Sequence, residues 1–294
     1  MFSSGFIPVI GRSNVGKSTL INSFLGKKVL IVSPKPQTTR DRIQAILTTE
    51  NSQLIFLDTP GMHKARNKLG DYMVSSARSS LQDADLILFV VEATAPPGPG
   101  DTFIATFLRE IKTPVFLVVN KMDQSPQDFD EKLFPLYREL GNFKGIFTVS
   151  ALMGEKIDQL LEAITEQMPP GPSYFPPEMI TDRPEQFLAG EIIREKIMLC
   201  TREEIPHSVA VIINRMEPRD DGLLIVEAVV YVEKKSQKQI VIGKEGSMLK
   251  KIGTMARAEL EKFLGNHLFL DIWVKVKKDW RQKESVLRQL GYHN

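Results

Sequence analysis

The sequence predicts an α/β domain with a mostly parallel sheet, followed by a smaller α+β domain. Short apolar runs alternate with longer amphipathic stretches over residues 1–168, which is the pattern of βαβ units. Six prolines then fall within 168–184, and proline interrupts both helices and central strands. The rest of the chain predicts the order helix, strand, strand, helix, strand, which is typical of an α+β domain. We therefore expect a first domain at 1–168, an interdomain linker at 169–185 and a second domain at 186–294.

The strands and helices of the first domain follow from these periodicities. Apolar runs that predict strands lie at 6–10, 54–57, 86–91, 115–119 and 146–149. Residues 19–25 predict a helix, and Ile157, Leu160, Leu161 and Ile164 recur at the spacing of a second one.

The second domain is predicted in the same way. Helices are expected at 186–199 and 248–264, and strands at 209–213, 223–232 and 268–276. The second of these helices has an apolar face made by Leu249, Ile252, Ala256, Leu260 and Phe263.

The composition is that of a globular protein. The chain has 294 residues, of which 42% are hydrophobic and 25% charged. Its longest apolar run, Leu86–Val91, is far shorter than the roughly 18 residues of a membrane-spanning helix. A single cysteine, Cys200, excludes an intramolecular disulfide, and the four histidines lack the spacing of metal ligands. With no basic stretch before the first apolar segment we expect no signal peptide, and so a reduced, cytoplasmic protein.

Positive charge is concentrated in the second domain. Residues 1–184 hold 19 basic and 20 acidic side chains, whereas 234–283 holds 13 basic against 5 acidic. Such a region is suited to a polyanion, either a nucleic acid or an anionic lipid surface. A solvated lysine-rich helix has the same composition, so charge alone does not decide.

A phosphate-binding motif follows the first predicted strand. The residues concerned are Gly11, Arg12, Ser13, Asn14, Val15, Gly16, Lys17, Ser18 and Thr19, and the first eight fit G-x-x-x-x-G-K-[ST]. Glycines allow successive N–H groups to point at phosphate oxygens, and the helix N-terminus adds partial positive charge. Lys17 would neutralise the β- and γ-phosphates, and the Ser18 hydroxyl would bind Mg²⁺.

Asp58, Thr59, Pro60 and Gly61 follow the next strand that the pattern predicts, at 54–57. An aspartate at the carboxyl end of a strand, 41 residues after Lys17, is placed to support the same Mg²⁺. Gly61 would let a backbone N–H approach the γ-phosphate, where a Cβ atom would obstruct it.

Two further loops predict a preference for guanine. Asn120, Lys121 and Asp123 follow the strand at 115–119, and a carboxylate accepts both N1–H and the 2-amino group of guanine. Two such charge-assisted bonds give roughly 3–6 kcal/mol of selection over adenine. Ser150 and Ala151 follow the strand at 146–149, and we expect their backbone N–H groups to face guanine O6.

Taken in order, these four motifs resemble those of the translation-factor-related, Ras-like GTPases. The resemblance implies GTP and GDP as ligands, Mg²⁺ held by Ser18, Thr39 and Asp58, and catalytic roles for Lys17, Thr39 and Gly61. Pro36–Arg40 resembles the first switch segment, in which Thr39 is the favoured Mg²⁺ ligand and Thr38 stays open.

Hydrolysis is where the chain departs from Ras. Met62 stands where Ras has a water-orienting glutamine, and a thioether cannot hold water in that way. We therefore expect slow turnover. Asn14 matches the asparagine that holds K⁺ near the phosphates in potassium-activated relatives. His63 is either a water-positioning residue or, as we favour, an exposed loop histidine.

A glycine loop in the second domain resembles that of a KH domain. Ile242, Gly243, Lys244, Glu245 and Gly246 contain G-x-x-G, and Lys250 and Lys251 lie in the helix expected after it. These seven residues are the candidate RNA-binding site, since two glycines let an RNA backbone approach and lysines attract phosphate. The resemblance implies a type II KH fold that clamps about four unpaired nucleotides. Trp273 and Trp280 are candidates for base stacking, although we favour core packing for Trp273.

The whole chain resembles the family of Ras-like GTPases that carry a C-terminal KH domain. That resemblance implies binding of single-stranded RNA near the 3′ end of small-subunit ribosomal RNA, a role in small (30S) subunit assembly, a monomer, and peripheral contact with the inner membrane. Two alternatives stay open. One is a membrane-associated GTPase, and the other is an RNA-binding module in which GTP is only a structural ligand.

Overall fold

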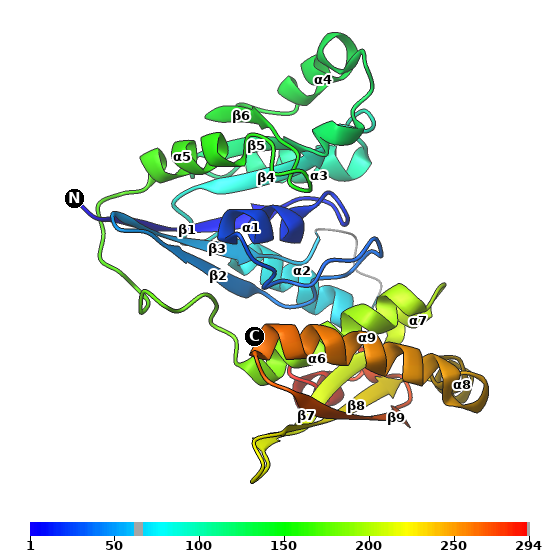
Figure 1. The fold of residues 1–294 in the computed structure, drawn as a ribbon. Helices are drawn as coiled ribbons and strands as arrows, with labels where there is room; N and C mark the ends of the chain where they lie inside the picture. Colours follow the sequence, from blue (N-terminus) through cyan, green and yellow to red (C-terminus); the bar gives the residue numbers. More distant parts are fainter. Residues whose placement is uncertain (62–66, 293–294) are drawn as a thin grey trace. The chain divides into compact units, whose positions relative to one another are not determined.

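The computed structural model describes residues 1–61 and 67–292, and the chain divides into two compact units. The first holds most of the chain up to Asp182, and the second holds the chain from Arg183 onward together with the short segments 33–36 and 67–69. Each unit has its own sheet (Figure 1). Within the described residues, no helix combines the length and the hydropathy that crossing a bilayer requires.

The first unit is built on a six-stranded sheet in the order β2-β3-β1-β4-β5-β6. Its strands are β1 (Ser3–Ile10), β2 (Ile43–Thr48), β3 (Ser52–Asp58), β4 (Ile87–Glu92), β5 (Val115–Asn120) and β6 (Gly145–Thr148). All neighbouring strands pair in parallel except β2 and β3. The prediction of a mostly parallel sheet is therefore confirmed, and the carboxyl ends of five strands lie at one edge.

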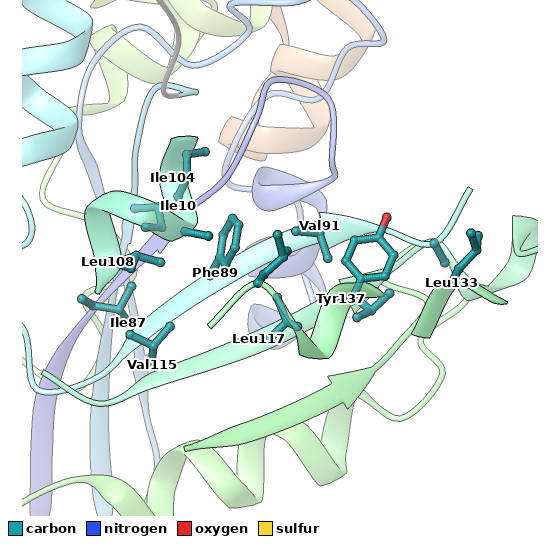
Figure 2. Close-up of a cluster of buried hydrophobic side chains, with 14 of the residues drawn as sticks. Ile10, Ile87, Phe89, Val91, Ile104, Leu108, Val115, Leu117, Leu133 and Tyr137 are labelled. Atoms are coloured by element: carbon teal, nitrogen blue, oxygen red, sulfur yellow. The ribbon is translucent and has the colours of Figure 1, made fainter. Parts of the chain in front are cut away.

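Helices cover the sheet of the first unit. They are α1 (Lys17–Leu25), α2 (Lys68–Ser79), α3 (Pro99–Leu108), α4 (Phe134–Arg138) and α5 (Ile157–Gln167). Figure 2 shows the main core, where alternate residues of β4 and β5 meet α3 and Tyr137. Because the side chains of these strands are buried on both faces, each strand reads as a continuous apolar run.

Strand β2 is the element of this sheet that the sequence pattern did not predict. Its residues pair antiparallel with β3, so that Ile43 lies opposite Asp58. Only part of β2 is apolar, because it lies at the end of the sheet order and has a neighbouring strand on one side alone. The segment that precedes β2 consequently ends beside the carboxyl end of β3.

Residues 169–182, which we call the strap, are bound along the first unit. The Ser4 N–H donates to Pro169 O at 3.1 Å, and the Ile46 N–H donates to Ile180 O at 2.9 Å. Phe175 and Met179 pack against the apolar cluster of Ile46, Ile55 and Leu57. Most of the segment expected as an interdomain linker is thus hydrogen-bonded and packed, although it contains no regular helix or strand.

One fully buried side chain holds the middle of the strap. The Gln53 carboxamide oxygen accepts the N–H groups of Tyr174 and Phe175 at 2.7 and 3.0 Å. Its nitrogen donates to Phe175 O at 2.8 Å and to Thr48 Oγ1 at 3.0 Å. All the hydrogen-bonding capacity of a glutamine is therefore used at this point.

The second unit has a three-stranded sheet in the order β7-β8-β9. Its strands are β7 (Ala210–Pro218), β8 (Leu224–Val232) and β9 (Leu268–Val276), and its helices are α6 (Glu185–Cys200), α7 (Ile205–Ser208), α8 (Lys235–Ile242), α9 (Ser247–Leu264) and α10 (Glu284–Gln289). Strand β8 pairs antiparallel with β7 and in parallel with β9. The predicted order lacked the short helices α7 and α10 and also α8, whose eight residues are mostly polar and precede a glycine loop.

The two tryptophans have opposite environments. Trp280 is fully buried, and its Nε1 donates to Ser208 O at 2.9 Å. Trp273 is 60% exposed, so the preference for core packing at this position was wrong. It alternates along β9 with Ile272 and Val274, which pack into the core, and it therefore points to the other face of the sheet.

Substituting Gln53 with leucine should release the strap. Leucine removes four hydrogen bonds between residue 53 and its partners. If the free energy that holds the strap on the first unit falls by about 2 kcal/mol, the fraction of molecules with a detached strap rises on the order of 30-fold. Chymotrypsin cleavage after Tyr174 should accelerate accordingly, as measured by the rate at which fragments appear. The matched control is Gln82→Leu at an exposed position. Equal cleavage rates for both variants would contradict this role of Gln53.

Candidate functional site

The predicted nucleotide-site residues lie in loops at one edge of the six-stranded sheet. The loops follow β1, β3, β5 and β6, whose carboxyl ends lie at that edge. Thr39 reaches the same place because β2, which follows it, is antiparallel and begins opposite Asp58. The topology alone therefore brings together the motifs that the sequence separates.

Close packing around the phosphate-binding loop explains two of its glycines. Gly16 has φ +98°, and a Cβ there would lie 2.2 Å from the Asn120 side-chain nitrogen. At Gly61 a Cβ would lie 2.7 Å from Ser13 Oγ. Asn14 also has a positive φ, +66°. The loop is thus in close contact with the two loops that follow β3 and β5.

Lys17 lies beneath the loop that it follows. Its ammonium donates to Arg12 O at 2.8 Å and to Gly11 O at 3.2 Å, and the residue is only 6% exposed. Burial lowers the pKa of Lys17 to about 8, and the nearby Asp58 carboxylate opposes that shift. A buried cation whose acceptors among the described residues are two carbonyl oxygens is stabilised further by a bound polyanion.

Three oxygen-bearing side chains converge beside Lys17. Asp58 Oδ2 accepts from Ser18 Oγ at 2.9 Å and from Thr39 Oγ1 at 2.8 Å, and the two hydroxyls lie 3.2 Å apart. Asp58 is 1% exposed and Thr39 is 8% exposed. The cluster joins the loops after β1 and β3 to the segment that precedes β2.

This oxygen set fits Mg²⁺. Magnesium prefers hard oxygen ligands and is usually bound through one or two carboxylates together with substrate phosphates and water. A carboxylate and two hydroxyls within hydrogen-bonding distance of one another satisfy that preference. Because the Thr39 hydroxyl belongs to this set, the geometry supports Thr39 as the threonine of the doublet that meets the metal.

The side chains of Arg12 and Thr59 are engaged away from the phosphate-binding loop. Arg12 Nε donates to the buried Asp101 at 2.8 Å, and Thr59 Oγ1 donates to Val9 O at 2.8 Å. Both residues belong to the predicted phosphate motifs, so what they offer a nucleotide is their backbone. Pro60 lies between Thr59 and Gly61 and is buried.

Asn120 joins three loops through one buried side chain. Its Nδ2 donates to Val15 O at 2.9 Å, and its Oδ1 accepts the Ala151 N–H at 2.9 Å. The next residue, Lys121, has φ +65°, a conformation that L-residues adopt rarely. The loop after β5 is therefore locked to both the phosphate-binding loop and the loop after β6.

The carboxylate of Asp123, predicted to recognise the base, is held by Ser150. Ser150 Oγ donates to Asp123 Oδ1 at 2.5 Å, and this bond is the main cause of the lowered pKa of Asp123. Ser150 and Ala151 were expected to offer their N–H groups to guanine O6. In the structure the Ser150 N–H donates to Glu155 O at 3.2 Å and the Ala151 N–H donates to Asn120 Oδ1 at 2.9 Å. The hydroxyl keeps Asp123 ionised and oriented, which is the state that accepts two donors from guanine.

Two polar residues at this edge were missed from the sequence. Asn22 on α1 bonds Val29 and Leu30 at 2.8–2.9 Å and so anchors the start of the segment 28–42. Glu92 ends β4 between the loops that follow β1 and β5. In the sequence, Glu92 could have been found as the charged residue that directly follows the apolar run 86–91. Met62 and His63, on which the expectations for hydrolysis fell, lie outside the described residues.

The glycine loop of the second unit connects α8 to α9. Gly243 ends α8 with φ +73°, and a Cβ there would lie 2.7 Å from Met248 N. Glu245 and Gly246 also have positive φ, +52° and +78°. The Gly246 N–H donates to Gly243 O at 3.3 Å, so the loop is a tight turn that leads directly into an 18-residue helix.

The side chains around this loop are available to a ligand. Lys244, Lys250 and Lys251 are exposed, and no ion pair involves them among the described residues. Glu245 is exposed beside them and reduces the local positive charge. Together with the N-terminus of α9, three lysines offer phosphate oxygens a positive surface.

Comparison with protein families assigns each unit. Residues 6–121 match a family described as 50S ribosome-binding GTPase, and residues 204–281 match the KH domain family. A GTPase Era of Clostridium kluyveri is 50% identical over 292 residues, covering 99% of this chain and 100% of that protein. The chain belongs to the Era family of GTPases. A GTPase Era of Heliobacterium modesticaldum is 51% identical over 289 residues.

Solved structures of the Era family agree with this assignment over the whole chain. One is Era in complex with MgGDPNP and nucleotides 1506–1542 of 16S ribosomal RNA, at 41% identity, a TM-score of 0.95 and full coverage of both chains. Another is a variant of Aquifex aeolicus Era bound to GDP·AlF₄⁻, at 41% identity and a TM-score of 0.94. The expectations of a Ras-like GTPase fold, a KH domain and GTPase activity are confirmed.

Substituting Asp123 with asparagine should change which base is bound. The amide would present a donor where guanine offers donors, but it would pair with the C2 oxygen of xanthine. GTP affinity should fall by about 100-fold or more, on the order of 3 kcal/mol, while XTP affinity rises. Calorimetric titration with both nucleotides measures this. The matched control is Asp128→Asn, which alters a partly exposed aspartate of the same unit. An unchanged GTP to XTP preference would mean that Asp123 does not face the base.

Proposed function

We propose that this chain is a slowly hydrolysing GTPase that binds single-stranded RNA near the 3′ end of 16S ribosomal RNA and acts in assembly of the small ribosomal subunit. The observation that supports this most directly is the full-length similarity to an Era bound to both MgGDPNP and that RNA segment. Membership of a GTPase family favours an enzyme over a module that holds GTP only as a structural ligand.

The nucleotide would be held by the four loops at the sheet edge. We assign the triphosphate to the N–H groups of 11–19 and the ammonium of Lys17, which is buried and positioned by two carbonyls. Asp123 and the stem of Lys121 would select and cover the guanine. Mg²⁺, held by Ser18, Thr39 and Asp58, would supply charge stabilisation to the phosphates. Gly61 would bring its N–H to the γ-phosphate because only a hydrogen atom fits beside Ser13.

RNA would be clamped at the loop between α8 and α9. Residues 242–246 form a turn in which the glycines allow close approach, and Lys250 and Lys251 follow on α9. Backbone contact through such a loop spans about four nucleotides. A clamp of this kind positions the strand, and bases are then distinguished by neighbouring groups.

Potassium is proposed as a second ion near Asn14. Asn14 lies within the phosphate-binding loop and has a left-handed backbone conformation, φ +66°, which asparagine adopts more readily than most residues. Single-turnover phosphate release should be faster in KCl than in NaCl, by roughly tenfold on the scale of one added charge contact. Substituting Asn14 with alanine should remove the difference between the salts. Equal rates in both salts for the unaltered chain would refute K⁺ activation.

We also propose a monomeric, cytoplasmic protein with peripheral membrane contact. The membrane contact is supported by the charge of residues 234–283, where 13 basic side chains stand against 5 acidic ones. Such a region suits anionic lipid headgroups as well as RNA. Flotation with anionic vesicles, with and without competing RNA, measures this contact. Absence of the protein from the vesicle fraction would exclude it.

Reversing one charge on α9 should weaken RNA binding. The Lys250→Glu variant should bind an RNA of nucleotides 1506–1542 about tenfold less tightly and show a shallower salt dependence, because a phosphate contact is lost. Lys262→Glu makes the same charge change near the other end of α9 and is the matched control. A gel-shift titration at two salt concentrations compares them. Equal affinities for the two variants would contradict a contact between Lys250 and the RNA.

A further inference from the structure

Glu92 lies between two of the loops assigned to the nucleotide. It is the last residue of β4, which is flanked in the sheet by β1 on one side and β5 on the other. In register it lies opposite Asn120, the first residue of the base-recognition motif. A side chain at this point can reach both the phosphate-binding loop after β1 and the base-recognition loop after β5.

The two carboxylate oxygens of Glu92 serve different loops. Oε2 accepts from Lys121 Nζ at 2.5 Å, whereas Oε1 lies 3.4 Å from Arg12 Nη2. These three side chains are 22–31% exposed, so water screens the contacts only in part. The shorter contact, to Lys121, is therefore the stronger of the two.

Arg12 is fixed independently of Glu92. Its Nε donates at 2.8 Å to Asp101, whose side chain is fully buried. Asp101 in turn accepts the Gly98 N–H at 2.9 Å at the start of α3. This second anchor means that loss of Glu92 would leave Arg12 in place and would free Lys121.

The position of Lys121 depends on such an anchor. A lysine has a flexible four-carbon stem, and its ammonium otherwise samples many rotamers in water. With the ammonium bound to Glu92, the stem is held at both ends, by the backbone and by the carboxylate. The positive φ of Lys121, +65°, adds a backbone constraint at the same residue.

We propose that Glu92 is a positioning residue for guanine nucleotide binding, which acts by holding Lys121 against the base and by tying the base-recognition loop to the phosphate-binding loop. The inference rests on the nucleotide site proposed above. It assigns to Glu92 no contact with the nucleotide, and so predicts an effect on affinity and not on the rate of the chemical step.

The test is a double-mutant cycle on the full chain with GTP and GDP. Glu92→Gln should weaken both nucleotides about tenfold, raise KM for GTP and leave kcat unchanged. In a Lys121→Met background the same change should alter affinity by less than about twofold, since the group through which Glu92 acts is gone. Asp128→Asn, which breaks the exposed ion pair with Lys132, is the control and should have no effect.

Three outcomes would overturn the proposal. The first is that Glu92→Gln binds GTP and GDP as tightly as the unaltered chain. The second is that Glu92→Gln lowers affinity equally in the Lys121→Met background. The third is that the loss of affinity accompanies a lowered Tm in both backgrounds. Glu92→Asp keeps the charge but shortens the side chain, and an intermediate loss is expected even if Glu92→Gln folds poorly. Failure of the proposed function is separate, because the unaltered chain would then bind neither nucleotide.

Discussion

The candidate site depends on the buried carboxamide of Asn120. One hydrogen bond fixes the loop after β5 to the carbonyl of Val15, and another fixes it to the N–H of Ala151. An amide that is 2% exposed cannot exchange these partners for water, so losing either one leaves a buried group unsatisfied. The tight approach at Gly16 follows from the same side chain. The loop that carries the phosphate-binding motif and the loop proposed to recognise the base are therefore parts of one rigid arrangement.

The three cationic side chains near the candidate site of the first unit are held by different kinds of partner. Arg12 and Lys121 carry their own carboxylates, whereas Lys17 has carbonyl oxygens and the more distant Asp58. A phosphate that enters the loop would consequently meet one incompletely compensated ammonium. In such an arrangement one cation is left to bind the anion, and the neighbouring cations help to position the loops around it.

Much of this arrangement can be predicted from the sequence, and the features that were missed or wrongly predicted have physical reasons. The motifs at Lys17, Asp58 and Asp123 were found because each follows an apolar run that must be a buried strand. Strand β2 and helix α8 were missed because they lie at an edge or beside a glycine loop, where burial does not impose a clear period. Trp273 shows the opposite failure, since a large apolar residue in an alternating strand can point to either face. The contacts of Ser150 were beyond prediction, because spacing does not tell whether a serine uses its hydroxyl or its N–H.

The strap has a consequence for where the first unit can be cut. Strand β2 has a neighbouring strand on one side only, and Ile180 O and Thr181 occupy part of its other side. A fragment ending at Met168 would expose that edge and uncover Ile46, Ile55 and Leu57. Unpaired edges of this kind recruit strands from other molecules. A soluble fragment of the first unit must therefore extend to Asp182, whose carboxylate caps the edge at the Gln44 N–H.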